Sequence, residues 1–250
     1  MTQSSMNGER DFSSAKVLVV GGSSGIGNAI ATAFRDRGAQ VCITGTRPGP
    51  EDYAGEDIDF AGTEYRQLDA SDRSAVETFE LPFDGLTVLV NSQGITPPTD
   101  IDPLDMDQFE RVLAVNLRSV AQLCGRFRSE LAASRGSVIN IGSGACFVAV
   151  PHRPSYSASK GGLLTLTKSL ASAWAKDGIR VNGIAPGYIP TRLTAPTDEN
   201  AERHARSLER IPMGRWGEAS EMSGVALFLA SPLASYVTGQ MIAADGGLTL

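Results

Sequence analysis

Short apolar runs alternate with longer amphipathic stretches along most of the chain. The first run, Val17–Val20, is apolar at every position, as expected of a parallel strand that is buried on both faces. After a turn, Ile26, Ile30 and Phe34 recur at helical spacing. Val41–Thr44 then resumes the apolar pattern. The opening therefore predicts one strand–helix–strand unit.

The same alternation continues to the end of the chain. It predicts further strands at 65–69, 86–91, 136–143, 179–187 and 239–247. It predicts further helices at 71–79, 105–134, 155–176 and 218–231. Strands that alternate with helices in this way indicate an α/β fold, with a doubly wound, mainly parallel, seven-stranded sheet and helices on both faces.

Three segments depart from the alternation. Residues 1–15 are polar and lack an apolar run, so we expect a flexible tail before a single domain at 16–250. Arg47–Gly62 is rich in Pro, Gly and acidic residues where a helix would normally lie, which predicts a short or missing helix. Gly187–Gly217 follows the C-terminal end of a strand, where ligands bind in such sheets, so it is a candidate substrate lid.

Composition narrows the class of protein. The 250 residues are 42% hydrophobic with a formal net charge of −6, enough for one core but unlike a nucleic-acid binder. No secretory signal or membrane-length apolar run is visible, which predicts a soluble, cytoplasmic protein. The three cysteines, Cys42, Cys124 and Cys146, lack metal-like spacing and are expected to be buried thiols, so no metal site is predicted.

The turn "GGSSGIG" is the first candidate for chemistry. Gly21, Gly25 and Gly27 lie between the first strand and the first helix. Gly21 permits a tight turn, Gly25 lets the backbone approach a pyrophosphate at the helix N-terminus, and Gly27 allows close packing on the strand. In this context the turn predicts dinucleotide binding.

Three further features carry polar chemistry. Tyr156 and Lys160 are four residues apart on one helix face, and a nearby ammonium would lower the pKa of the phenol. Their small neighbours let a cofactor or another chain come close. Ser143 stands at a strand end and Asn116 inside an apolar helix. Taken singly, each has an ordinary structural explanation, such as a half-buried tyrosine, a turn-forming serine or a local hydrogen bond.

Together, these features resemble a compact short-chain dehydrogenase/reductase over residues 16–250. The resemblance rests on "GGSSGIG", "NSQG", "VNLRS", "INIGS", "YSASK" and "IRVNGIAPGYIPT". It implies a Rossmann-type fold, a nicotinamide cofactor and a catalytic group of Asn116, Ser143, Tyr156 and Lys160. In that group Ser143 and Tyr156 polarise the substrate oxygen and Tyr156 moves the proton. Lys160 lowers the tyrosine pKa and holds the nicotinamide ribose, and Asn116 holds a water that relays protons.

The resemblance also implies where the cofactor lies. Asp69 would contact adenine, Asn91 and Gly94 would lie on the adenosine side, and Ile189 and Thr191 would contact the carboxamide. The chain departs from the family's usual pattern at Gln93, which adds a polar side chain near the cofactor. The predicted cofactor residues are Gly21, Ser23, Ser24, Gly25, Ile26, Gly27, Thr46, Arg47, Asp69, Ala70, Asn91, Gly94, Tyr156, Lys160, Pro186, Gly187, Ile189 and Thr191.

The end of the second strand bears on cofactor choice. NAD-dependent enzymes of this type place an acid there, whereas this chain has Gly45 followed by Thr46 and Arg47. Both of these can bind a 2′-phosphate, which favours NADP(H). A carboxylate of Glu51–Asp52 could instead fold back toward the ribose, and Ser24 stands where NADP-dependent relatives often carry Arg, so NAD(H) remains open.

Residues near the catalytic group outline the substrate. Ala145, Cys146, His152 and Tyr188 predict a mixed apolar and polar site. The chain resembles 3-oxoacyl-carrier-protein reductases, yet its segment 95–108 is acidic, and an acidic carrier needs a basic surface, to which Arg126 and Arg128 could still contribute. We therefore expect a small ketone or secondary alcohol, such as a sugar, cyclic alcohol or hydroxy acid.

Two alternatives to that function remain, together with one expectation about assembly. A 3-oxoacyl-thioester reductase is the second enzyme hypothesis. A cofactor-binding regulatory protein without chemistry is a third, disfavoured by the complete catalytic set. Relatives pair through the two long helices that contain Asn116 and Tyr156, which implies a homotetramer.

Overall fold

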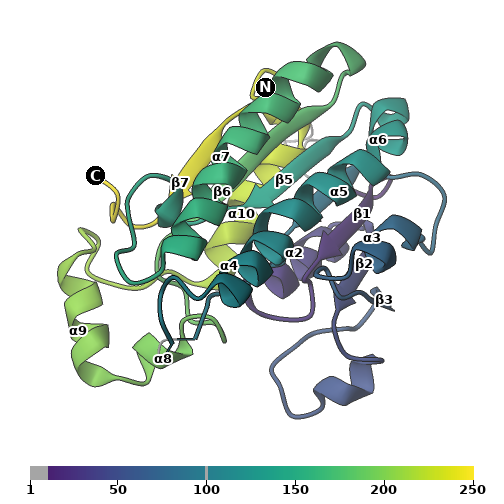
Figure 1. Cartoon of the computed structure of the whole chain (residues 1–250). Coiled ribbons are helices and arrows are strands. Elements are labelled where there is room, and N and C mark those ends of the chain that lie inside the picture. The colour runs from purple at the N-terminus through teal and green to yellow at the C-terminus, as the bar shows by residue number, and fades with distance from the viewer. Residues whose placement is uncertain (1–10, 99–100) are drawn as a thin grey trace.

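The computed structural model describes residues 11–98 and 101–250. Seven strands form one sheet in the order β3-β2-β1-β4-β5-β6-β7, and every neighbouring pair is parallel (Figure 1). The strands are β1 Lys16–Val20, β2 Gln40–Gly45, β3 Glu64–Gln67, β4 Val88–Asn91, β5 Ser137–Ile141, β6 Arg180–Pro186 and β7 Met241–Ala244. This confirms the predicted sheet, although the third strand ends two residues earlier than expected.

Helices cover both faces of the sheet (Figure 1). The α-helices are α2 Gly25–Arg35, α3 Arg73–Thr78, α4 Met106–Leu113, α5 Ser119–Arg126, α6 Arg128–Ser134, α7 Pro154–Trp174, α8 Ala195–Asp198, α9 Ala201–Glu209 and α10 Ala219–Ala230. Side chains alternate along β1, so Val17 and Val19 pack with α2 and α10, whereas Leu18 and Val20 pack with α3, α5 and α7.

The predicted helix over 105–134 is not continuous. After α4, a π-helical turn spans Ala114–Arg118, and α6 starts only after Phe127. In this turn the Ser119 amide donates to the Ala114 carbonyl, and the Ser119 hydroxyl donates to the Val115 carbonyl at 2.6 Å. The side chain thus serves a carbonyl that regular helical bonding would have used. The turn contains Asn116.

The three exceptional segments have different outcomes. Residues 1–10 of the predicted tail lie outside the described residues, but Phe12 is buried and packs edge-on against Phe34, with ring centroids 5.0 Å apart. The folded unit therefore begins before residue 16. Arg47–Gly62 holds a short 3-10 turn, η1 Pro50–Tyr53, as predicted. Gly187–Gly217 carries α8 and α9, which stand beyond the C-terminal ends of the strands (Figure 1).

The remaining class predictions concern thiols and membranes. Cys42, Cys124 and Cys146 are buried free thiols, as predicted. Within the described ranges, no helix combines the length and the apolar character that crossing a bilayer requires.

Candidate active site

A cleft of about 920 Å³ lies at the C-terminal ends of the strands. The strand order reverses direction between β1 and β4, which is where ligands bind in doubly wound sheets. The cleft brings together most of the predicted cofactor and catalytic residues. Those that line it are Gly21, Ser23, Ser24, Gly25, Ile26, Gly27, Thr46, Asp69, Ala70, Gly94, Ser143, Tyr156, Lys160, Pro186, Gly187, Ile189 and Thr191.

The glycine turn forms one wall of this cleft. Gly21 and Gly25 have φ angles of +74° and +48°, which side chains rarely adopt. A Cβ at Gly25 would lie 2.8 Å from the Thr191 side chain, and one at Gly21 would lie 2.8 Å from the Gln93 backbone. Ser24, before α2, makes no side-chain cap bond, so the first amides of the helix remain available to an anion. The cradle fits the pyrophosphate of a dinucleotide.

The catalytic side chains come from the end of β5 and the first turns of α7. The Ser143 side chain lies close enough to the Tyr156 phenol to favour the phenolate, and its hydroxyl accepts the Ala145 amide at 3.2 Å. Lys160 is buried, and its Nζ donates to the Ile141 carbonyl at 2.8 Å. The ammonium lies 5.7 Å from the centroid of the Tyr156 ring. The three predicted side chains therefore converge in the cleft, with Tyr156 and Lys160 buried and Ser143 partly exposed.

Burial controls the ionisation of this pair. Burial raises the pKa of Tyr156, and the nearby Ser143 hydroxyl opposes the rise only in part. The expectation that Lys160 lowers the tyrosine pKa stays a prediction, because Lys160 is not among the groups that shift the pKa of Tyr156 here. The lysine is itself desolvated, which lowers its own pKa to about 8, and its ammonium is directed to a backbone carbonyl rather than to the phenol.

Asn116 stands behind the cleft and holds the loop that follows β4. Its Oδ1 accepts the Ile95 amide at 2.9 Å, and its Nδ2 donates to the Ile95 carbonyl at 2.9 Å and to the Ser159 hydroxyl at 3.1 Å. The side chain is fully buried. A Cβ on Gly94 would meet both the Asn116 Oδ1 and the Lys160 Nζ, at 3.7 and 3.8 Å. The loop is therefore fixed directly against the catalytic lysine, and the water relay stays a prediction.

At the adenosine end, the end of β2 has no room for a side chain. A Cβ on Gly45 would collide with the Tyr53 hydroxyl and the Ser23 side chain. Thr46 lines the cleft, but Arg47 does not. The Arg47 guanidinium pairs with Glu56 at 2.6 Å and lies 4.4 Å from the centroid of the Tyr53 ring. The predicted phosphate ligand is thus already bound to a carboxylate.

Several predicted residues lie outside the cleft. Asn91 is buried and donates to Asn140 at 2.9 Å. Gln93, by contrast, lines the cleft, as expected of a polar residue near the cofactor, and its side-chain amide donates to Ser119 at 2.9 Å, at the end of the π turn. Ala145, Cys146 and His152 do not line the cleft, and His152 is exposed. The Cys146 thiol instead lies 3.2 Å from the Lys160 carbonyl.

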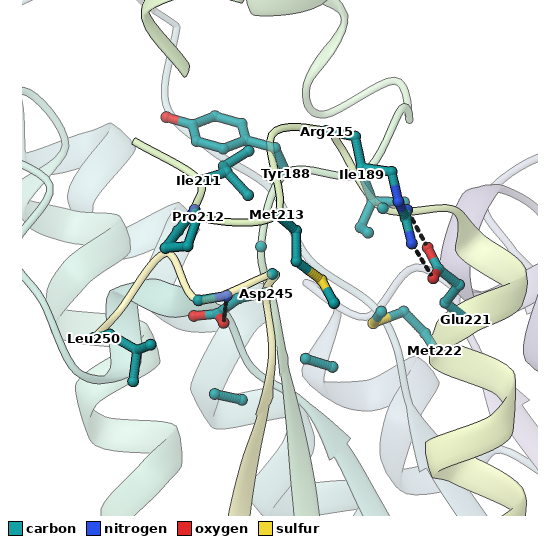
Figure 2. Close-up of a pocket in the computed structure, with 16 residues that line it drawn as sticks. Tyr188, Ile189, Ile211, Pro212, Met213, Arg215, Glu221, Met222, Asp245 and Leu250 are labelled. Atoms are coloured by element: carbon teal, nitrogen blue, oxygen red, sulfur yellow. Dashed lines mark hydrogen bonds and ion pairs between the residues drawn. The ribbon is translucent and has the colours of Figure 1, made fainter. Parts of the chain in front are cut away.

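Tyr188 borders a second cavity of about 530 Å³ (Figure 2). This cavity lies among the loop after β6, residues 211–217 and the C-terminal residues. Figure 2 shows Arg215 and Glu221 paired at one side of it, at 2.7 Å. Tyr188 stacks on Trp216 with ring centroids 5.2 Å apart. Ser143, Tyr156 and Lys160 are not among its lining residues, although Gly187 and Ile189 border both cavities.

Three arginines of the cleft were not predicted. Arg111, Arg153 and Arg192 all line it, and Arg153 lies close enough to Tyr156 to favour the phenolate electrostatically. The sequence could have indicated two of these arginines by their closeness to predicted site residues. Arg153 precedes Tyr156 by three residues, and Arg192 follows Thr191. Charge alone could not single them out among the 22 Lys and Arg residues.

Comparisons with known proteins agree with this geometry. A family model described as enoyl-(acyl carrier protein) reductase matches residues 20–249. The chain is 37% identical to galactitol 2-dehydrogenase (L-tagatose-forming) of Cereibacter sphaeroides, over 94% of this chain and 95% of that protein. It is 36% identical to a 3-oxoacyl-[acyl-carrier-protein] reductase of Chlamydia pneumoniae, over 94% and 96%. The structure of a gluconate 5-dehydrogenase from Burkholderia cenocepacia with NADP and tartrate has a TM-score of 0.88 at 29% identity and covers 98% of each chain.

Proposed function

Because the chain belongs to the short-chain dehydrogenase/reductase family and is an NAD(P)-dependent oxidoreductase, we propose that it interconverts a small hydroxylated ketone and its secondary alcohol, with NADP(H) preferred. The observation that carries this proposal is the convergence of Ser143, Tyr156 and Lys160 in the cleft that holds the glycine turn. The folded unit from Phe12 onward serves as one catalytic domain, with 187–217 as its lid, and the enzyme works as a cytoplasmic homotetramer.

The bound nicotinamide supplies or accepts the hydride. Ser143 donates a hydrogen bond to the substrate oxygen and holds it beside the phenol. Tyr156 delivers the proton during ketone reduction and accepts it during alcohol oxidation. Burial raises the tyrosine pKa, so the phenol is protonated at neutral pH and is ready to donate.

Lys160 and Asn116 support this proton transfer without contacting the substrate oxygen. With a pKa lowered to about 8, Lys160 can exchange protons at mildly alkaline pH. Its hydrogen bond to the Ile141 carbonyl fixes the ammonium 5.7 Å from the centroid of the tyrosine ring. Asn116 acts as a positioning residue, because its amide fixes the backbone of Ile95 and thereby the loop that lies against Lys160.

Charge in the cleft favours a hydroxy acid or sugar acid among the small substrates. Arg111 and Arg153 line the cleft, and a guanidinium binds a carboxylate through paired hydrogen bonds. The similarity to sugar alcohol and gluconate dehydrogenases supports the same class. We therefore favour a polyhydroxylated substrate that carries a carboxylate.

A 3-oxoacyl thioester is the second candidate, supported by the similarity to the carrier-protein reductase. The surface argues against an acidic carrier. Arg126 and Arg128, the two arginines that the sequence offered as contacts for a carrier, are engaged with Glu130 at 3.7 Å and Asp177 at 2.8 Å. Asp102, Asp105 and Asp107 are exposed and follow Pro97 and Pro98, which line the cleft, by only a few residues. These charges would repel an acidic partner.

Substrate oxidation and reduction followed at the nicotinamide absorbance would test the proposal. The panel should pair gluconate with the neutral polyol sorbitol and include galactitol and a 3-oxoacyl thioester, each with both cofactors. We expect turnover of at least one polyol or sugar acid, with the acid favoured in the matched pair. Turnover of the thioester alone would replace this proposal by the second candidate.

Tyr156→Phe tests the mechanism in the same assay. The variant should bind cofactor with a Kd near that of the wild type and lose at least about 100-fold in kcat, because the proton donor is gone. Tyr236→Phe, at a fully exposed tyrosine, is the matched control and should keep wild-type kcat. A Tyr156→Phe variant with near-normal turnover would contradict the assigned role.

A further inference from the structure

Two arginines from opposite sides of the adenosine end converge on one carboxylate. Arg47 follows β2 and pairs with the Glu56 Oε1 at 2.6 Å. Arg192 belongs to the loop after β6 and approaches the Glu56 Oε2 at 3.7 Å. Glu56 itself lies in the segment that replaces a helix between β2 and β3. The three groups connect the lid to that segment beside the cleft.

The position of this cluster relates it to the cofactor. Arg47 directly follows Thr46, which lines the cleft, and Arg192 lines the cleft itself. Thr191, the neighbour of Arg192, contacts the glycine turn closely enough that a Cβ on Gly25 would clash with it. The cluster therefore stands beyond the pyrophosphate cradle on the side of β2, where the adenosine ribose of a dinucleotide lies in this kind of fold.

The guanidinium groups of Arg47 and Arg192 form an anion-binding site, and the Glu56 carboxylate of the same chain occupies it. Arg47 is fixed by packing on the Tyr53 ring, with 4.4 Å between the guanidinium carbon and the ring centroid. The side chains of Arg47, Glu56 and Arg192 are 36%, 30% and 60% exposed, so an ion from solvent can reach them. The acids expected from the sequence do not compete here, because the Asp52 carboxylate accepts the Gly49 amide at 2.9 Å and Glu51 lies against Gly49.

We propose that Glu56 is a specificity-determining residue whose carboxylate occupies the place of the cofactor's 2′-phosphate between Arg47 and Arg192. This inference rests on the proposed function, since it assumes a dinucleotide in the cleft. A 2′-phosphate must displace Glu56 from the arginines, whereas the 2′-hydroxyl of NAD(H) need not. Glu56 thus weakens binding of the phosphorylated cofactor and narrows the preference for NADP(H) over NAD(H).

Binding of cofactor fragments to Glu56→Gln isolates this effect from catalysis. The fragments are 2′,5′-ADP and 5′-AMP, which differ by the 2′-phosphate, titrated by calorimetry. Release of a partly exposed ion pair should lower the Kd for 2′,5′-ADP about fivefold and leave the Kd for 5′-AMP within about twofold. The gain should shrink at high salt. Asp57→Asn removes the adjacent exposed charge, which forms none of the ion pairs found among the described residues, and should change neither Kd.

Arg192→Gln provides an independent variant on the opposite wall. It should raise the Kd for 2′,5′-ADP several-fold and leave 5′-AMP binding unchanged. An unchanged or weaker affinity of Glu56→Gln for 2′,5′-ADP would overturn the inference. If Glu56→Gln failed in this way but the wild type bound both NADPH and NADH, the proposed function would still stand. If the wild type bound neither, both proposals would fall.

Discussion

Replacing Asn116 by Ala separates its structural contribution from its contribution to the active site. The change removes an amide that is fully buried and makes three hydrogen bonds, two to the backbone of Ile95 and one to Ser159. The Ile95 loop would then lose the contact that fixes it beside Lys160. We expect a loss of stability and a separate, larger loss of turnover.

The magnitude follows from the hydrogen bonds. At about 1 kcal/mol each, three bonds predict a loss of roughly 3 kcal/mol in the free energy of unfolding. Asn182 offers a matched control, because it is also fully buried and also holds a backbone segment, donating to Val237 at 2.8 Å and accepting from Gln240 at 3.0 Å. Asn182→Ala should lose roughly 2 kcal/mol by the same count. It lies at the far side of the sheet from Tyr156.

Urea denaturation gives the two stability losses, and steady-state kinetics at a temperature where both variants are folded gives kcat. A loop displaced by about 1 Å can cost roughly 100-fold in rate, so we expect that order of loss for Asn116→Ala and less than about threefold for Asn182→Ala. Equal kcat values for the two variants would refute the idea that Asn116 positions the site.

Two further outcomes test the cofactor end and the buried lysine. Gly45→Asp should lower Tm, because the Tyr53 hydroxyl and the Ser23 side chain already fill the space that a side chain at position 45 would need. For the same reason the variant should not prefer NAD in kcat/KM. A switch to NAD at unchanged Tm would contradict this. The pKa of Lys160 is lowered from 10.5 to about 8 in the fold, so the unfolded chain binds more protons between those values and wild-type stability should rise with pH there relative to Lys160→Met. Parallel unfolding free energies of the two proteins from pH 7 to 10 would show that the lysine is not desolvated.

Local patterns predicted most of the fold because they encode burial directly. The run Val17–Val20 and the spacing of Ile26, Ile30 and Phe34 specified the first unit, and the structure confirms it. The π turn was not predictable in this way. It depends on a bond from Gln93 to Ser119 that joins two separate segments, and an apolar repeat carries no record of such a contact.

The sequence predicted which residues form the site, but not their pKa shifts or their ion pairs. Tyr156 and Lys160 were identified by their spacing and by the family resemblance. The sequence did not show that burial raises the pKa of Tyr156 and lowers the pKa of Lys160. The sequence offered Glu51 or Asp52 as carboxylates that could fold back toward the ribose, but it did not indicate that Glu56 pairs with Arg47. Asp52 satisfies the Gly49 amide three residues away, whereas Glu56 reaches Arg47 through a loop whose path the sequence does not define.

The small residues around Tyr156 acquire a different explanation from the one the sequence suggested. They were expected to leave room for a cofactor or another chain. In the structure, Ser159 accepts a hydrogen bond from Asn116, and a Cβ on Gly162 would lie 2.8 Å from Leu117. Both partners belong to the π turn. Small side chains on α7 therefore let a widened helical turn approach, and this approach brings Asn116 and the Ile95 loop against Lys160. The catalytic lysine and the irregular helix are consequently parts of one packing arrangement, which a larger residue at position 159 or 162 would disrupt.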